Sequence, residues 1–207
     1  MSKYIVLDLE MCRIPKGIKH ETFKSSRELI QIGAVELNES YQITKTFMTY
    51  VKPEFGILDS TICRLTGISD HDTQFAPIAK DALNAFLNWL PEDAVLVTWS
   101  VNDINQIDDE LYFKNIDLPD LYDYLDNYID CQVLFSEKMN RDKLYNLKEA
   151  LSIANVDYDT NIHDALVDAK NTALLFSKIQ TEDRLVLSPY YISQEDIMRY
   201  RSSYVYC

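Results

Sequence analysis

The chain has 207 residues, of which 47% are hydrophobic, and this is enough to build the core of one domain of ordinary size. Gly and Pro number only 4 and 6, so long disordered linkers are not expected, and no run of about 18 apolar residues predicts a membrane span. The formal net charge of −13 argues against a protein that grips a long nucleic acid through its phosphates, although an enzyme acting on a strand end needs fewer such contacts.

The cysteines indicate a reducing, cytoplasmic location. They are scattered, without a Cys-x-x-Cys pair, at Cys12, Cys63, Cys131 and Cys207. This spacing argues against a zinc site or a disulfide framework. The first residues run directly into a strand pattern and leave no room for a secretory signal.

The predicted elements form an α/β chain. Strand patterns come first, at residues 4–11, 29–37 and 43–51, and short connections between them favour an antiparallel meander. A loop with a short helix then leads to helical patterns and further strands at residues 75–90 (helix), 94–99 (strand), 103–113 (helix), 120–139 (edge strand, then helix), 147–154 (helix) and 164–179 (helix). This order predicts a mixed sheet, antiparallel first and then parallel, flanked by helices. We expect residues 1–180 to form one domain and residues 181–207 to pack on it as a Tyr-rich helical extension, with a capping box at Ser193–Asp196.

Two carboxylates interrupt the first strand. Asp8 and Glu10 are two positions apart in an otherwise apolar run, so they should project from the same side while Leu7 and Leu9 project from the other. Burying two neighbouring negative charges is costly unless a cation compensates them, and hard divalent cations prefer carboxylate ligands. The alternative is an exposed edge strand with both acids in water.

A further acid follows the predicted strand at 94–99. Asp103 would lie in the first turn of the next helix, where Ser100 to Asp103 forms an S-x-x-D capping pattern. Taken alone, Asp103 is better explained by the helix start than by a ligand role, and the two roles do not exclude each other. Asp108 and Asp109 are expected to face solvent.

The last predicted helix carries an acid in an unusual place. Asp168 falls within a stripe of small residues (Ala165, Ala169, Thr172 and Ala173) that suits a helix pressed against a sheet, so its carboxylate should point at the sheet. His163 precedes Asp168 by five positions, and both can face one site only if His163 lies at or before the helix start, with Asp164 as the cap. The alternative for His163 is a loop histidine satisfied by local hydrogen bonds.

Together these residues resemble the motifs of the DEDDh branch of the DnaQ-like 3′–5′ exonucleases, which have a ribonuclease H-like fold. Asp8 and Glu10 match the D-x-E motif, Asp103 matches the second motif, and His163 and Asp168 match H-x(4)-D. The segments "LIQIGAVELN", "FMTYVKP", "ICRLTGI" and "APIAKDALNAFLNWL" are similar to the histone-mRNA and small-RNA 3′ exonuclease subgroup. Met11 stands where that family often has Thr or Phe.

The resemblance implies a catalytic site of Asp8, Glu10, Asp103, Asp168 and His163. The four carboxylates would hold two Mg²⁺ or Mn²⁺ ions, with Asp8 bridging them, and His163 would be the general base. Met11 and Leu65 are candidates for packing against the terminal nucleotide, with plain core packing as the alternative.

The resemblance also implies the substrate and the product. A monomer would trim single-stranded 3′ ends, RNA favoured, and release nucleoside 5′-monophosphates. A DNA proofreader or a dinucleotide-cleaving oligoribonuclease of the same superfamily, a catalytically weak binding module that keeps the fold, and a structural protein with an acidic face stay open as alternatives.

Overall fold

The sheet is mixed, as the order of the predicted elements indicates. The computed structural model describes residues 3–15 and 24–191. Its sheet has five strands in the order β3-β2-β1-β4-β5. The first three strands pair antiparallel: β1 (Lys3–Arg13), β2 (Arg27–Leu37) and β3 (Ile43–Tyr50). On the other side of β1, the sheet continues with β4 (Ala94–Thr98) and β5 (Tyr128–Asp130), which run parallel to β1. The predicted fold class is confirmed.

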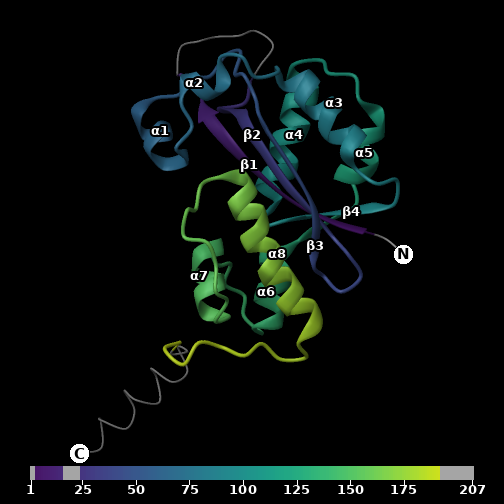
Figure 1. Ribbon diagram of the computed structural model, residues 1–207, viewed down its shortest axis with the longest axis vertical. Helices are drawn as coiled ribbons and strands as arrows, with labels where there is room; N and C mark the ends of the chain where they lie inside the picture. Colours follow the sequence, from purple (N-terminus) through teal and green to yellow (C-terminus); the bar gives the residue numbers. More distant parts are fainter. Residues whose placement is uncertain (1–2, 16–23, 192–207) are drawn as a thin grey trace, which may run out of the picture.

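Helices cover both faces of this sheet (Figure 1). One face carries α3 (Ala79–Trp89), α4 (Val101–Phe113) and α5 (Pro119–Leu125), and the other carries α6 (Cys131–Lys138), α7 (Leu147–Ile153) and α8 (Ala165–Thr181). The short helices α1 (Ser60–Thr66) and α2 (Asp70–Thr73) lie together beyond the end of β1 (Figure 1). The sheet therefore separates two hydrophobic cores.

Strand β1 divides its side chains between these cores by simple alternation. Ile5, Leu7 and Leu9 are buried against the α3–α5 layer, and Val6 is buried against the α6–α8 layer. Asp8 and Glu10 have the parity of Val6, so they point to the face that α8 covers. This agrees with the side predicted for the two acids.

Helix α8 lies unusually close to the sheet at one point. A Cβ atom built on Gly33 would lie 2.2 Å from the backbone C of Ala165 and 2.2 Å from the N of Leu166. Gly33 is directly opposite Asp8 in the β1–β2 ladder. The missing side chain therefore lets the first turn of α8 rest on the strand beside Asp8.

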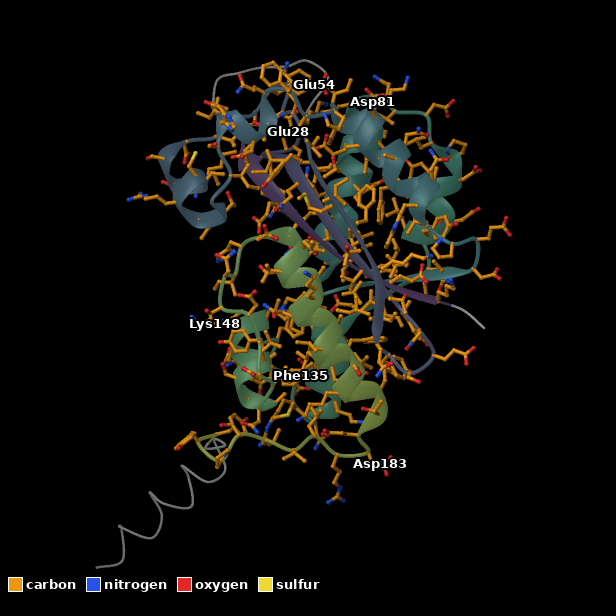
Figure 2. The ribbon with its side chains drawn as sticks, in the orientation of Figure 1. Glu28, Glu54, Asp81, Phe135, Lys148 and Asp183 are labelled. Atoms are coloured by element: carbon orange, nitrogen blue, oxygen red, sulfur yellow. The ribbon has the colours of Figure 1, made fainter. Side chains whose placement is uncertain are left out.

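A buried ion cluster holds the loop that follows β3. The Glu28 carboxylate accepts the backbone N–H groups of Glu54, Phe55 and Gly56, and the Lys114 ammonium lies 2.6 Å from Glu28 and 2.8 Å from Glu110. Both Glu28 and Glu110 are fully buried. Figure 2 shows Glu28 and Glu54 close together at the end of the sheet where α1 and α2 lie. No sequence pattern predicts this cluster.

Two regions differ from the sequence prediction, and a third lies outside the described residues. Helix α5 precedes the short strand β5, whereas only a strand edge is predicted there. Residues 182–191 are not helical, and Ser188 donates its N–H to the Ile153 carbonyl at 2.8 Å. The predicted capping box Ser193–Asp196 and its helix lie outside the described residues. Within the described ranges, no helix has both the length and the apolar character that crossing a bilayer requires.

Candidate active site

The two acids of β1 lie at the centre of the sheet. Glu10 is only 8% exposed and is paired with Gln31 of β2, and Asp8 is paired with Gly33. β1 is flanked by β2 and β4, so the alternative of an edge strand in water does not apply. Both carboxylates therefore face the start of α8 from the middle of the sheet.

The acid of α4 reaches the same place from the end of β4. Ser100 caps the helix by accepting the Asn102 N–H at 3.4 Å, and Asp103 lies in the first turn with 6% exposure. The pairing of β1 with β4 ends at Leu7 and Thr98, so the N–H of Leu9 has no β4 partner. Burial raises the pKa of the Asp103 carboxyl, and hydrogen bonding from this N–H partly offsets the rise.

The remaining two predicted residues flank the start of α8. Asp164 caps the helix through its Oδ1, which accepts the Val167 N–H at 3.0 Å, so His163 lies just before the helix as required. The N–H of His163 donates to Asp168 Oδ2 at 2.9 Å. His163 has a φ of 70°, a conformation that costs L-residues energy and is found where surrounding contacts enforce it. The structure brings Glu10, His163 and Asp168 together, with one ligand atom of each within 4.8 Å of the others.

The crowding of acids shows in their pKa values. Burial, together with the charges of Asp168 and Asp103, raises the pKa of Glu10 to about 8. Burial also raises the pKa of Asp103 to about 7. The pKa of Asp8 is raised well above its ordinary value, first by burial and then by Asp103, Asp168 and Glu10. Burial likewise raises the pKa of Asp168. Carboxylates in such a group are unfavourable together without a cation.

A hard divalent cation fits this donor set. Among the described residues, Asp168 Oδ1 is a buried oxygen without a hydrogen-bond partner, although buried oxygens normally have one. Asp168 Oδ2 is already used by the His163 N–H, so Oδ1 is the atom left for a ligand role. Carboxylate oxygens are the ligands that Mg²⁺ and Mn²⁺ prefer.

The candidate substrate-packing residues differ in exposure. Leu65 on α1 is 47% exposed, and Met11 near the end of β1 is partly buried against the core.

A cavity of about 290 Å³ opens beside the acids and is lined by Asn146, Leu147, Lys148, Ile162, His163 and Asp168. Figure 2 shows Lys148 on the outer side of α7. Asp108 is exposed and Asp109 half-buried, and neither belongs to the acidic group.

Two residues of β2, Gln31 and Gly33, shape the site although no sequence motif marks them. Gly33 admits α8, and Gln31 is fully buried and hydrogen-bonds Asp164 and Ala165 across the gap to that helix. The only sequence signal is that Gln31 and Gly33 interrupt the apolar residues of "LIQIGAV", a stretch that otherwise suits a buried strand. Gly in a strand interior often marks a close backbone approach, and here it does.

The fold and the site define a class of protein. A mixed sheet of this strand order, with acids from β1, α4 and α8 and a histidine before α8, is the arrangement of a nuclease with a ribonuclease H-like fold. The family model for the exonuclease family RNase_T matches residues 5–176, and the chain belongs to this family. The resemblance to the DEDDh exonucleases is confirmed.

Individual relatives agree with this membership. The chain is 28% identical over 186 residues to zebrafish ERI1 exoribonuclease 2, covering 78% of this chain and 33% of that protein. It is also 28% identical over 186 residues to the DNA polymerase III subunit epsilon of Buchnera aphidicola, covering 86% of this chain and 71% of that protein. The chain thus spans about one third of the zebrafish protein's length.

A solved structure shows the same fold. The nuclease domain of 3′hExo, a DEDDh family member bound to rAMP, superposes with a TM-score of 0.70 at 20% identity, covering 90% of this chain and 96% of that one.

Proposed function

We propose that this protein is a metal-dependent 3′–5′ exonuclease that releases nucleoside 5′-monophosphates from single-stranded 3′ ends. The observation that carries the proposal is that Glu10, His163 and Asp168 offer ligand atoms within 4.8 Å of one another, beside an Asp168 oxygen without a hydrogen-bond partner. Asp8 and Asp103 lie near enough for their charges to enter the same group, since Asp103 raises the pKa of both Asp8 and Glu10. Family membership supports the same chemistry. A structural protein with an acidic face has no need to bury these acids.

The carboxylates of Asp8, Glu10, Asp103 and Asp168 would hold two Mg²⁺ or Mn²⁺ ions. Such ions, when bound, neutralise the acids, lower the pKa of water and stabilise charge on a displaced oxygen. Three elements would supply this donor set: β1 would supply Asp8 and Glu10, and the first turns of α4 and α8 would supply one acid each. Few side chains need to move, since every acid is held by a strand or a first helical turn.

His163 would act as the general base. Its backbone N–H donates to Asp168, and one of its imidazole nitrogens lies within 4.8 Å of a carboxylate oxygen of Glu10 and of Asp168. Imidazole takes up protons near neutral pH, which suits removal of a proton from the attacking water. A bond then forms between this water oxygen and phosphorus while the bond to the 3′ oxygen of the preceding nucleotide breaks, and that oxygen takes up a proton.

The substrate proposal rests on the relatives and on charge. RNA is favoured because the zebrafish relative is an exoribonuclease, and Met11 and Leu65 would pack against the terminal nucleotide. The net charge of −13 suits an enzyme that engages a short strand end rather than a long duplex. We propose a cytoplasmic monomer in which residues 1–180 form the catalytic domain and 181–207 its extension.

End-labelled substrates test the proposal directly. Matched RNA and DNA single strands, each labelled at the 5′ end, should shorten one nucleotide at a time with Mg²⁺ or Mn²⁺ and remain intact with EDTA. Asp8→Asn should abolish this shortening, and Asp108→Asn should not. Intact strands under all metal conditions, with a folded protein, would instead favour the catalytically weak binding module.

A further inference from the structure

A single buried glutamine connects the sheet to the segment that carries His163 and Asp168. Gln31 is fully buried on β2, directly opposite Glu10. Its Oε1 accepts the Ala165 N–H at 2.9 Å, and its Nε2 donates to Asp164 Oδ2 at 3.4 Å. One side chain therefore links the strand next to the acids of β1 with the first residues of α8.

The bond to Ala165 satisfies a group that the helix itself leaves open. The first N–H groups of a helix have no partner within it, and Ala165 is the first residue of α8. The Asp164 cap serves a different donor, the Val167 N–H. The Ala165 N–H therefore depends on Gln31.

The two bonds require both a donor and an acceptor at position 31. A neutral amide offers both, whereas a carboxylate offers only acceptors and an aliphatic side chain neither. Orientation is fixed as well, since turning the amide over would set its NH₂ against the Ala165 N–H. The amide at position 31 is thus matched to the carboxylate at position 164.

The segment held in this way is a strained one. His163 has a φ of 70°, and its N–H is bonded to Asp168, so His163, Asp164 and Asp168 form one turn. Strained backbone persists only where neighbouring contacts over-determine it. Beside the close approach at Gly33, Gln31 makes two hydrogen bonds that tie this turn to β2, and β2 is paired through the ladder with Glu10 and Asp8.

We propose that Gln31 is a positioning residue that sets the His163–Asp168 turn against Asp8 and Glu10, and so controls metal affinity and turnover. The inference rests on the proposed function for its catalytic part. Partners that orient metal ligands typically change metal affinity 10–100-fold when mutated. A displacement of about 1 Å at a reacting group can lower the rate about 100-fold.

A swap of the two side chains tests the match. Q31E sets a carboxylate against the carboxylate of Asp164, and D164N sets an amide NH₂ against the amide NH₂ of Gln31. Each variant should therefore bind Mn²⁺ about 10–100-fold more weakly by calorimetry. Each should also show a lower kcat with little change in KM. The double variant Q31E/D164N keeps the total charge and restores a donor–acceptor pair, since the new carboxylate at position 31 would accept both the Ala165 N–H and the new amide N–H at position 164. Mn²⁺ affinity and kcat should return toward the wild-type values, which is a coupling that independent sites do not show.

Two further variants separate positioning from stability. Q132E alters the amide that donates to the Tyr145 carbonyl in the α6 region, so it should lower Tm without changing Mn²⁺ affinity. Q31L removes both bonds without adding charge, and it should accelerate hydrogen exchange at the Ala165 amide.

The inference is overturned if Q31E, like Q132E, leaves Mn²⁺ affinity unchanged. It is also overturned if the double variant has an Mn²⁺ affinity and a kcat no higher than those of the weaker single variant. If the wild-type protein neither binds Mn²⁺ nor cleaves, the proposed function fails on its own. The exchange rate at Ala165 then still decides whether Gln31 is the anchor, because equal rates in Q31L and wild type overturn it.

Discussion

Removing one charge from the acidic group should make the metal-free protein more stable while ending its activity. Asp168→Asn is the suitable change, because the amide keeps the size of the side chain and an oxygen that can accept the His163 N–H. At a separation of at most 4.8 Å from Glu10, two unit charges repel by about 3.5 kcal/mol at an effective dielectric constant of about 20. Losing an acid from the first turn of α8 offsets about 0.3–1 kcal/mol of this gain.

The net gain depends on pH with a definite sign. Glu10 has its pKa raised from 4.5 to about 8 in the folded protein. A carboxyl whose pKa is raised by folding stabilises the protein at pH values below its unfolded pKa. This contribution is lost as the pH rises through the folded pKa. The wild-type protein without metal should therefore lose stability between about pH 5 and 8. Asp168→Asn should raise the free energy of unfolding of the metal-free protein by about 2.5 kcal/mol at about pH 8.5, and by less than about 1 kcal/mol at about pH 6.

Thermal unfolding in EDTA at these two pH values measures the effect. For a protein of this size about 2.5 kcal/mol corresponds to a rise in Tm of about 5–10 °C. Asp108→Asn makes the same charge change on the exposed side of α4 and should leave Tm nearly unchanged. Adding Mn²⁺ should raise the Tm of the wild-type protein and not that of Asp168→Asn. A lower Tm for Asp168→Asn at the higher pH, or an undiminished response to Mn²⁺, would refute the electrostatic reasoning.

Three other predictions rest on the same geometry. His163→Ala should cut turnover about 10²–10⁴-fold on a labelled strand, while the Tm rise with Mn²⁺ persists, since a general base and not a main ligand is lost. Gly33→Ala should abolish both cleavage and the Mn²⁺ response, because its Cβ would collide with the backbone at Ala165 and α8 must move away; an active Gly33→Ala would show that the close approach is not needed. Lys114→Met should lower the free energy of unfolding by about 3–5 kcal/mol in urea titrations, since it leaves Glu28 and Glu110 buried without their cation.

The sequence predicted those parts of the site that depend on local periodicity. Strand alternation put Asp8 and Glu10 on one face, and the capping pattern at Ser100 put Asp103 in a first helical turn. The stripe of small residues put Asp168 against the sheet, where it is 8% exposed. Each of these inferences needs only neighbours within one strand or one helical turn.

The parts that the sequence did not predict depend on distant partners. Lys114 and Glu28 are 86 positions apart, and nothing near either residue indicates the other. Helix α5 is short and its sequence, PDLYDYL, mixes acids with tyrosines, so its periodicity is weak beside the strand that follows. Gln31 reaches Asp164 across 133 positions. In each case of a distant pair, the contact exists only once the sheet has brought its strands into register.

Register also explains why the motifs alone do not make the site. The ladder sets Gly33 opposite Asp8 and Gln31 opposite Glu10, and the register shifts between Glu10 and Met11. A slip of one residue would set Ile32 or Ala34 opposite Asp8 and turn the whole face over. A side chain would then stand where the first turn of α8 must rest, and the amide that holds Ala165 would face the other core. The pairing of β2 with β1 therefore decides whether the acids of β1 can meet Asp168 at all.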